Sequence, residues 1–511
     1  MGVNAPVSSG HAVAGLALPL GALLYYLWRL KDRQDALLRS MLLQKEAIVA
    51  ITRVPMPSML FVPLYPLQVL YRAIKEYRHF DVLHQLHMVL GLDTWSVSLP
   101  MQATYTMTTN PQNVEHILRV NFDNYVKGDD FFIARAMDLL GNGIFNVDGM
   151  TWFHQRKTAS HMFTQKNLTN HIWRVIGKNT AKVVQLLLEV PAGSTADLFN
   201  TMNRFTLDTI GEIGFARNIG ALDNAESPFL KSFDVAQQVV FLRMILPCWS
   251  LRRLLRWGAE NDSAKHFRLL HDYSRETVRD LKARLQSERG DSFVGLFMRE
   301  AEKTGEPHDE KFMEEMVLNF LIAGRDTTAQ ALSWTFFLLI QHPEVEKRVF
   351  DEIAEVCGEG DLMYEHVNRL TYLQAVLHES LRLYPSVPLD LKTALRPDTL
   401  PDGTSVAKGD VIVYNIYAMG RSEKIWGKDA CEFKPDRWLS KEFPSLYAYP
   451  VFNAGPRECL GRRLALVEMK ACLVHVLRSV KLTLAVPPED IRYDVQLTIG
   501  MSSGLPCKVE P

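Results

Sequence analysis

Hydrophobic side chains recur at three- and four-residue spacing along most of the chain. This spacing places apolar residues on one face of an α-helix, so it predicts a helix wherever it persists over several turns. It persists through residues 160–190, 200–215, 262–288, 311–341, 343–357 and 366–383. The pattern therefore predicts a mainly α-helical protein.

Alternation of apolar and polar residues, which is typical of β-strands, is rare and short in this chain. Residues 95–99 and 105–109 alternate on either side of Pro100, which predicts a small hairpin. Residues 411–414 follow an Asp-Gly turn and form a further candidate strand. The predicted fold class is mainly α with a minor antiparallel β sheet.

The longest predicted helix, from about Phe312 to Gln341, has an unusual centre. Residues 323–328 there are Ala-Gly-Arg-Asp-Thr-Thr. Glycine costs about 1 kcal/mol inside a helix, and Thr hydroxyls bond back to the preceding turn. Residues that oppose a helix in the middle of a core helix indicate function or strain.

The N-terminal region has a different pattern. Residues 12–28 form a run of 17 residues without a charge, directly followed by Arg29, Lys31 and Arg33. Such a run is at the lower limit for crossing a bilayer, and the cations place the rest of the chain in the cytosol. A cleavable signal peptide is the alternative, although no basic segment precedes the run. We expect a single N-terminal transmembrane helix.

The expected organisation is a membrane anchor and flank at residues 1–33, a Pro-containing linker at 34–70 and one large domain at 71–511. No Gly/Ser-rich linker or repeat divides this domain. A composition of 47% hydrophobic and 23% charged residues suffices for a core that encloses a cofactor. The net charge of −1 argues against nucleic acid as the main partner.

One of the six cysteines has a distinctive sequence around it. Cys459 ends the segment Phe452-Asn-Ala-Gly-Pro-Arg457-Glu-Cys and is followed by Leu-Gly461, just before an apolar helix. The glycines allow the backbone to approach a flat cofactor, and Arg457 supplies a fixed charge. A thiolate at this place is suited to ligate haem iron, where it favours cleavage of the O–O bond. The other cysteines show no C-x-x-C spacing, which argues against a zinc ribbon or covalent haem.

This segment resembles the haem-binding loop of the cytochrome P-450 monooxygenases, which it matches at Phe452, both glycines, Arg457 and Cys459. The resemblance implies the cytochrome P-450 fold and haem b as the cofactor. It implies that Cys459 is the axial ligand of the iron, that Phe452, Arg457 and Gly461 contact the haem, and that O₂ is the co-substrate.

Residues 323–328 match the oxygen-binding helix of the same monooxygenases. By this resemblance Ala323 and Gly324 lie against the haem, and Gly324 leaves room for the gas. Asp326 and Thr327 form the acid–alcohol pair that relays protons to the oxygen-activating centre. The chemistry requires a hydroxyl that donates at hydrogen-bond distance and a carboxylate that reloads it.

Glu379 and Arg382 lie one turn apart in an apolar stretch, which suggests a buried ion pair. They resemble the E-x-x-R element of the family, whose third partner is an arginine in a later loop. Arg437 fits that place, although Asp436 stands where Glu is commoner. The resemblance implies that these residues give structural support to the haem pocket.

Trp152 and Arg156 resemble the W-x-x-x-R element of the family. The resemblance implies that both side chains reach a haem propionate, for which Arg offers a planar fork of donors. Lys392 is a candidate for the second propionate, a position at which family members differ.

The chain contains no nicotinamide or flavin fingerprint, so its electrons must come from another protein. The resemblance implies an NADPH-dependent flavoprotein reductase, with cytochrome b5 as a further candidate donor. Lys157, Arg462 and Arg463 lie near the haem motifs in the sequence and are candidate contacts for an acidic partner. An ordinary solvated face has the same pattern.

Residues 417–421 and 425–429, together with Arg325, resemble the long-chain fatty acid and alkane hydroxylases of plants, algae and fungi. This resemblance implies ω-hydroxylation of a long-chain fatty acid by an enzyme of the endoplasmic reticulum membrane, with its catalytic domain on the cytosolic face. The alternatives are an alkane, sterol or terpenoid substrate, a haem-thiolate isomerase or dehydratase of lipid hydroperoxides, and a non-catalytic haem sensor.

A terminal C–H bond is stronger than the bonds of the inner methylenes, so attack at the chain end requires a narrow apolar channel. The candidate lining residues are Phe131 and Phe132, in the predicted loop before Trp152, Leu321 on the oxygen helix, and Val387 and Leu389 after the ion pair. Each of them is equally compatible with an ordinary core position.

The segment from Val239 to Trp257 alternates apolar residues with Arg243, Arg252, Arg253 and Arg256. Such amphipathic segments with tryptophans favour a membrane interface. An ordinary surface helix is the alternative.

Overall fold

The computed structural model describes residues 78–98, 103–224, 228–246, 248–285, 295–299, 310–440, 443–494 and 496–510. The elements discussed below belong to the larger of two compact units, which consists of Leu70–His84 and Asp93–Pro511. The predicted transmembrane helix at residues 12–28 lies outside the described residues. Among the residues that are described, no helix is long and apolar enough to cross a membrane.

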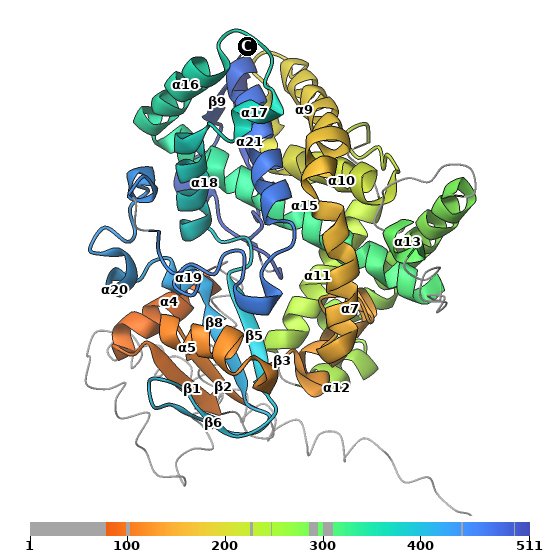
Figure 1. Ribbon diagram of the computed structural model, residues 1–511, viewed down its shortest axis with the longest axis vertical. Coiled ribbons are helices and arrows are strands. Elements are labelled where there is room, and N and C mark those ends of the chain that lie inside the picture. The colour runs from red at the N-terminus through yellow and green to blue at the C-terminus, as the bar shows by residue number, and fades with distance from the viewer. Residues whose placement is uncertain are drawn as a thin grey trace, which may run out of the picture. The chain divides into compact units, whose positions relative to one another are not determined.

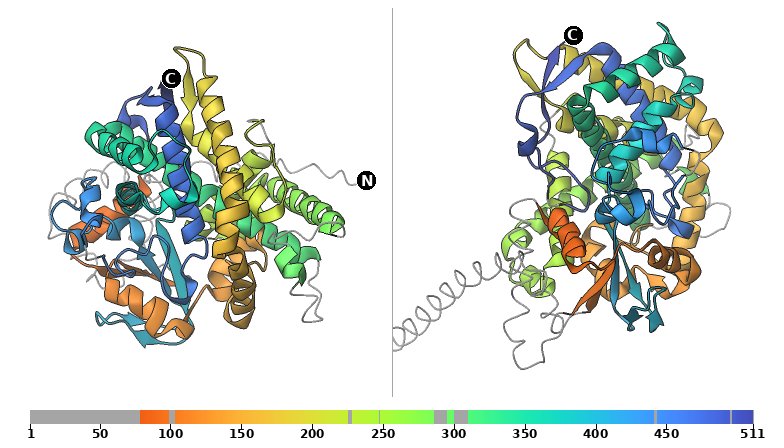
Figure 2. Two further views of the ribbon diagram at one scale, coloured as in Figure 1. Left: turned by 45° about the horizontal axis from the view of Figure 1, so that its top comes forward. Right: turned by 90° about the vertical axis from the view of Figure 1, so that its left-hand side faces the viewer.

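Helices form most of this unit, as the hydrophobic spacing predicts (Figure 1). The longest is α15 (Glu310–Gln341), and Pro343 begins the next helix, α16 (Pro343–Cys357). The other long helices are α7 (Gly149–Ser160), α9 (Trp173–Leu188), α10 (Leu198–Phe215), α11 (Pro228–Ile245), α13 (Ser263–Leu285), α18 (Thr371–Leu383) and α21 (Arg462–Ser479). The views in Figures 1 and 2 show α9 beside α21, and the two helices are in contact.

Two predicted helices are interrupted. The stretch 160–190 begins at the last residue of α7 and passes through the short helices η5 (His161–Phe163), α8 (Gln165–Asn167) and η6 (Leu168–Ile172) before α9. The stretch 366–383 is divided between α17 (Tyr364–Val367) and α18. The backbone N–H groups of Tyr372 and Leu373 donate to the Glu352 carboxylate at 2.6 and 2.8 Å. A carboxylate at this place pairs free amides and stabilises the start of a helix. Because Glu352 belongs to α16, the periodicity of α18 alone does not reveal it.

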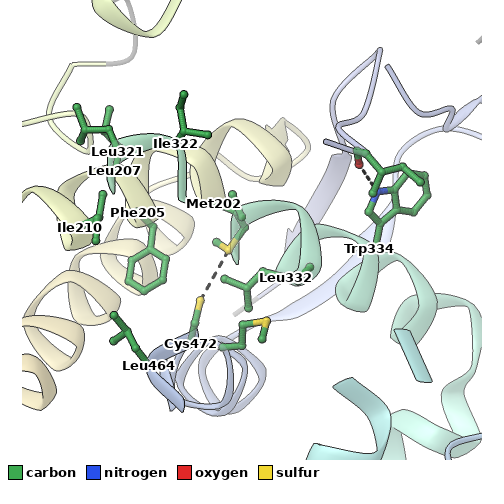
Figure 3. Packing of buried hydrophobic residues seen from close by; sticks show 14 of the residues in the cluster. Met202, Phe205, Leu207, Ile210, Leu321, Ile322, Leu332, Trp334, Leu464 and Cys472 are labelled. Carbon is green, nitrogen blue, oxygen red and sulfur yellow. Dashed lines mark hydrogen bonds between the residues drawn. The ribbon is translucent and has the colours of Figure 1, made fainter. Parts of the chain in front are cut away.

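The hydrophobic core is centred on α15, which packs against α10, α18 and α21. Figure 3 shows Met202 and Phe205 of α10 facing Leu332 of α15 and Cys472 of α21. The Sγ atom of Cys472 lies 3.7 Å from the Sδ atom of Met202. Near the end of α15, Trp334 donates its indole N–H to the carbonyl of Ile499 at 2.7 Å. The core therefore fixes α15 along its whole length.

The main sheet has five strands in the order β1-β2-β8-β5-β3 (Figure 1). The predicted hairpin is confirmed, with β1 antiparallel to β2 and Thr94 opposite Thr108. However, β2 and β8 are parallel, with Tyr105 opposite Val411, so the expectation of a purely antiparallel sheet is wrong. A long connection separates these two strands, and their direction is free of the constraint that a tight hairpin imposes. The strands are β1 (Thr94–Ser98), β2 (Thr104–Thr108), β3 (Tyr125–Val126), β5 (Leu389–Ala394) and β8 (Val411–Asn415).

The segment before Trp152 is helical rather than a loop. It forms a π-helical turn, η4 (Gly128–Ile133), which continues into α6 (Ala134–Leu140). This corrects the expectation for Phe131 and Phe132, which lie in η4. Contacts of η4 with β5, and of α6 with α11 and α15, hold the two segments in place.

The predicted interfacial segment divides between the end of α11 and α12 (Trp249–Leu254). Arg243 does not belong to its polar surface, because the side chain is 2% exposed and pairs with Glu260 and Asp138 at 2.7 and 2.9 Å. Paired arginines tolerate burial, and sequence spacing does not distinguish them from solvated ones. Leu254 and Trp257 are exposed, as an interfacial segment requires.

Candidate active site

The segment around Cys459 is a compact turn. The backbone N–H of Cys459 donates to the carbonyl of Phe452 at 2.8 Å, so the two ends of the segment meet. Asn453 and Gly455 have positive φ angles of 58° and 65°. A Cβ atom at Gly455 would overlap the carbonyl oxygen of Leu118, so only glycine fits at this position. The turn therefore holds the backbone of Cys459 in a fixed position just before α21.

Cys459 is accessible to solvent, although protein atoms surround its thiol closely. The residue is exposed, whereas burial raises the pKa of its thiol and the backbone N–H of Gly461 lowers it. These two observations agree if the thiol opens into an interior recess rather than toward bulk water. The positive charge of Arg156 also lowers the pKa of Cys459. A thiolate is therefore favoured once a cation is placed over the sulfur.

Trp152, Arg156 and Arg457 meet beside this turn, as the sequence predicts. The Arg457 guanidinium lies 4.5 Å from the centre of the Trp152 ring, and its Nη2 donates to Asp148 Oδ1 at 2.7 Å. Arg156 donates through Nη2 to the carbonyl of Glu458 at 2.6 Å. Asp148 is the member of this group that the sequence did not predict, because it lies 309 residues from Arg457 in the chain and belongs to none of the motifs.

Lys392 is fully buried on β5, and its Nζ atom has no hydrogen-bond partner among the described residues. Burial lowers the pKa of Lys392 well below its usual value, and the neighbouring cation Lys127 adds to this effect. The nearby carboxylate of Asp390 forms its ion pair with Lys127, at 2.8 Å, and not with Lys392. An unpaired buried cation is unfavourable until an anion reaches it. Lys392 therefore fits the carboxylate of a haem propionate.

The oxygen-helix motif forms the one open turn of α15. From Met313 to Leu339 every residue of this helix is buried except Ala323, Gly324 and Thr327, which share one face. Thr327 donates its hydroxyl to the carbonyl of Ala323 at 2.7 Å, as expected for a Thr inside a helix. A Cβ at Gly324 would overlap Ile210 of α10, so helix packing already requires a glycine here. The role of Gly324 in admitting the gas stays a prediction.

Asp326 lies on another face of α15 and does not bond to Thr327. Its Oδ1 atom accepts from Arg325 Nη1 at 2.8 Å, and the same nitrogen donates to Asp234 of α11 at 2.7 Å. Burial raises the pKa of Asp326 to about 7, against the opposing effect of Arg325. Gln237 of α11 faces the carboxyl and lowers its pKa, yet Asp326 Oδ2 and both polar side-chain atoms of Gln237 lack a well-formed hydrogen bond within the described residues.

Glu379 is the centre of a buried cluster that confirms the predicted ion pairs. Its carboxylate accepts two bonds from Arg382, each of 2.8 Å, and one from Arg437 at 2.8 Å. Trp438 completes the cluster by donating its indole N–H to Oε2 at 2.8 Å. Asp436 lies outside the cluster, on the surface, where it pairs with Arg348.

The candidate channel residues come from three segments. Phe131 is buried and meets the Tyr105 ring edge to face at 5.5 Å, and Phe132 lies under the Lys127 ammonium at 4.5 Å. Val387 and Leu389 are half-buried. Leu321 is completely buried in the hydrophobic core shown in Figure 3, and it offers no open surface. The assignment of a channel to these residues stays a prediction.

Comparison with known proteins gives one consistent result. The model of the family described as Cytochrome P450 matches residues 62–502. The chain is 33% identical to cytochrome P450 704B1 of Arabidopsis thaliana over 486 residues, which cover 86% of this chain and 92% of that protein. It is 36% identical to cytochrome P450 94A2 of Vicia sativa over 440 residues, which cover 82% and 84% of the two chains.

The matched range contains every element of the site, from the Trp152 and Arg156 pair to the turn that carries Cys459. Haem bound beside this turn would find an accessible face of α15 at Ala323, Gly324 and Thr327 and a buried cation, Lys392, suited to its carboxylates. Both lines of reasoning lead to the same assignment, and the chain belongs to the cytochrome P450 family of haem-thiolate monooxygenases.

Proposed function

We propose that this monooxygenase hydroxylates long-chain fatty acids at the ω carbon, with haem b as its cofactor and NADPH as the source of its electrons. The observation that carries the proposal is the open turn of α15 at Ala323, Gly324 and Thr327, which places one accessible hydroxyl on an otherwise buried helix within the hydrophobic core. Apolar surroundings suit a hydrocarbon substrate, because burial of each CH₂ group contributes about 0.8 kcal/mol to binding.

The residues around Cys459 have separate roles. Bound haem would supply the activation of oxygen, with Cys459 as the thiolate that holds its iron. Lys392 and Arg156 would bind its propionates by charge-assisted hydrogen bonds. Arg457, tied to Asp148 at 2.7 Å, would orient Trp152 and keep the turn in register with α7.

Asp326 and Thr327 would deliver protons. The Thr327 hydroxyl donates to the carbonyl of Ala323 at 2.7 Å, and its oxygen would accept a hydrogen bond from a proton donor. Asp326 has a pKa of about 7 and can hold or release a proton near neutral pH. An isomerase of lipid hydroperoxides has no need of this pair.

The surface of α12 supports a membrane location. The exposed side chains of Leu251, Leu254, Leu255 and Trp257 are accompanied by Arg252, Arg253 and Arg256. Apolar groups flanked by cations favour the boundary between lipid and headgroups. We place the enzyme at the endoplasmic reticulum membrane with its catalytic domain in the cytosol, where a substrate dissolved in the bilayer is within reach.

The family takes its electrons from a reductase, and we propose an NADPH-dependent flavoprotein, with cytochrome b5 as a second donor. Lys157 and Arg463 are exposed, and Arg462 is half-buried and paired with Glu458. These residues lie at the ends of α7 and α21 that carry the haem motifs, so a docked acidic partner would be near the site.

Product analysis with reductase and NADPH tests the substrate class. Saturated and monounsaturated acids of C12 to C18 should give mainly the ω-hydroxy acid. Thr327→Ala should keep haem and substrate binding but divert electrons to hydrogen peroxide, because the hydroxyl at the open turn is lost. No binding of any of these acids, together with oxidation of a sterol or terpenoid, would exclude fatty acids as the substrate.

A further inference from the structure

Arg135 of α6 is a half-buried arginine without a carboxylate partner among the residues that the structure describes. Its Nε donates to the carbonyl of Arg243 at 3.0 Å. Its Nη1 donates to the carbonyls of Asp130 and Phe131 at 3.0 and 2.8 Å. A guanidinium has five N–H groups, so the two on Nη2 are left for another acceptor.

Two acidic side chains near Arg135, those of Asp138 and Glu260, are engaged by other arginines. Asp138, one turn along α6, pairs with Arg243 at 2.9 Å and with Arg253 at 3.0 Å. Glu260 pairs with Arg243 at 2.7 Å. Arg135 is therefore the cation of this group whose charge is matched only by carbonyl dipoles and aromatic rings.

Two aromatic rings flank the guanidinium. Its central carbon lies 4.1 Å from the centre of the Phe131 ring and 5.6 Å from that of Trp249. Burial among these groups lowers the pKa of Arg135. A cation in such apolar surroundings attracts an anion more strongly than one in water, because the effective dielectric constant is lower.

The position of Arg135 connects the surface with the interior. Trp249 begins α12, which presents exposed Leu251 and Leu254. Phe131 is buried on the inner side, in η4, which contacts β5, and α6 itself contacts α15. Arg135 thus lies on a helix that contacts α15, and its guanidinium faces Trp249 at the start of α12.

We propose that Arg135 binds the carboxylate of the fatty acid substrate. The inference rests on the proposed function and makes it more specific. A fatty acid has a single charged end, so a carboxylate held on Nη2 between Phe131 and Trp249 leaves only the alkyl chain to enter the apolar interior. The chain then presents its methyl end to the haem, which selects the ω carbon.

Binding of two matched ligands by the full-length holoenzyme tests this role. Dodecanoic acid and its methyl ester have the same alkyl chain, and only the acid carries a charge at neutral pH. Arg135→Gln should weaken binding of the acid on the order of tenfold to a hundredfold, as expected for a lost charge-assisted bond. Binding of the ester, measured by the same spectral titration, should change less than about threefold. Hydroxylation of the acid should also spread from the ω carbon to inner positions.

Two further variants separate charge recognition from folding. Arg135→Lys should recover most of the affinity for the acid, and Lys231→Gln, which removes an exposed cation of α11, should leave both ligands unaffected. The carbon monoxide spectrum of each variant checks that the haem is retained. Equal weakening of acid and ester in both Arg135 variants would show a purely structural residue. A wild-type enzyme that binds neither ligand would exclude the fatty-acyl substrate itself, whereas wild-type binding without an acid-specific loss would exclude only the anchor.

Discussion

At the scale of single residues, Lys392 combines complete burial with an ammonium group that has no hydrogen-bond partner among the described residues. Its ammonium group is fully buried, and Lys127 and Arg457 are among the neighbours that lower its pKa. An isolated buried charge costs several kcal/mol or gives up its proton instead. The same property makes Lys392 a strong ligand for an incoming carboxylate.

Lys392→Met should therefore have opposite effects on the two forms of the protein. The pKa of Lys392 is lower in the folded than in the unfolded chain, so between these two values the unfolded state binds more protons and stability rises with pH. The substitution should raise the unfolding temperature of the haem-free protein at pH 7 and flatten this pH dependence. The holoprotein should lose haem faster to an acceptor protein.

Lys127→Met is the matched control for this prediction. Lys127 is paired with Asp390 at 2.8 Å, so its removal takes an ion-pair partner from a carboxylate that keeps only neutral donors such as Tyr414 and Asn453. This loss should destabilise the protein without haem. If both substitutions changed the unfolding temperature of the haem-free protein in the same direction, the conclusion that Lys392 lacks a partner would be contradicted.

At the scale of elements, the contact between α11 and α15 governs the protonation of Asp326. The charged and polar groups that face this carboxyl are Arg325 on its own helix, and Asp234 and Gln237 on α11. Desolvation dominates and raises the pKa of Asp326 to about 7, above the usual value of 3.8. A small displacement of α11 therefore changes how readily the acid gives up its proton.

The fraction of electrons recovered in product should depend on pH with a midpoint near 7. Below this pH Asp326 is neutral and donates, and above it the carboxylate must first be reloaded, so coupling falls as the pH rises. Asp326→Asn should remove this pH dependence and increase the solvent isotope effect. Asp234→Asn removes a negative charge that raises the pKa of Asp326, and Arg325 then pairs with Asp326 only. The pKa of Asp326 should fall, and the midpoint should move to lower pH. An unchanged profile in both variants would show that protons follow another path.

The sequence predicted many elements and site residues because local signals specify them. The open turn at residues 323–327, the turn around Cys459 and the Glu379 cluster follow from spacing and motif. The late start of α18 was not predictable, because Glu352 stabilises it from another helix. The parallel pairing of β2 with β8 and the burial of Arg243 likewise depend on partners far away in the chain.

At the scale of the whole molecule, the residues assigned to the site all lie between Phe131 and Gly461, far along the chain from the predicted anchor. A variant that lacks residues 1–33 should therefore fold and bind haem, and its reduced carbon monoxide complex should keep the spectrum of thiolate ligation. It should sediment with vesicles less than the full chain does. Failure to incorporate haem would show that these residues contribute to the fold.

The burial of α15 also has a consequence for hydrogen exchange. The backbone amides of its inner turns are bonded within a helix whose sides are covered by α10, α18 and α21. Local fraying does not reach such amides, so deuterium enters them mainly when the whole domain unfolds. Their exchange rates are a direct measure of the global free energy of unfolding. They allow the gain in stability on haem binding to be measured in the native protein, without denaturant.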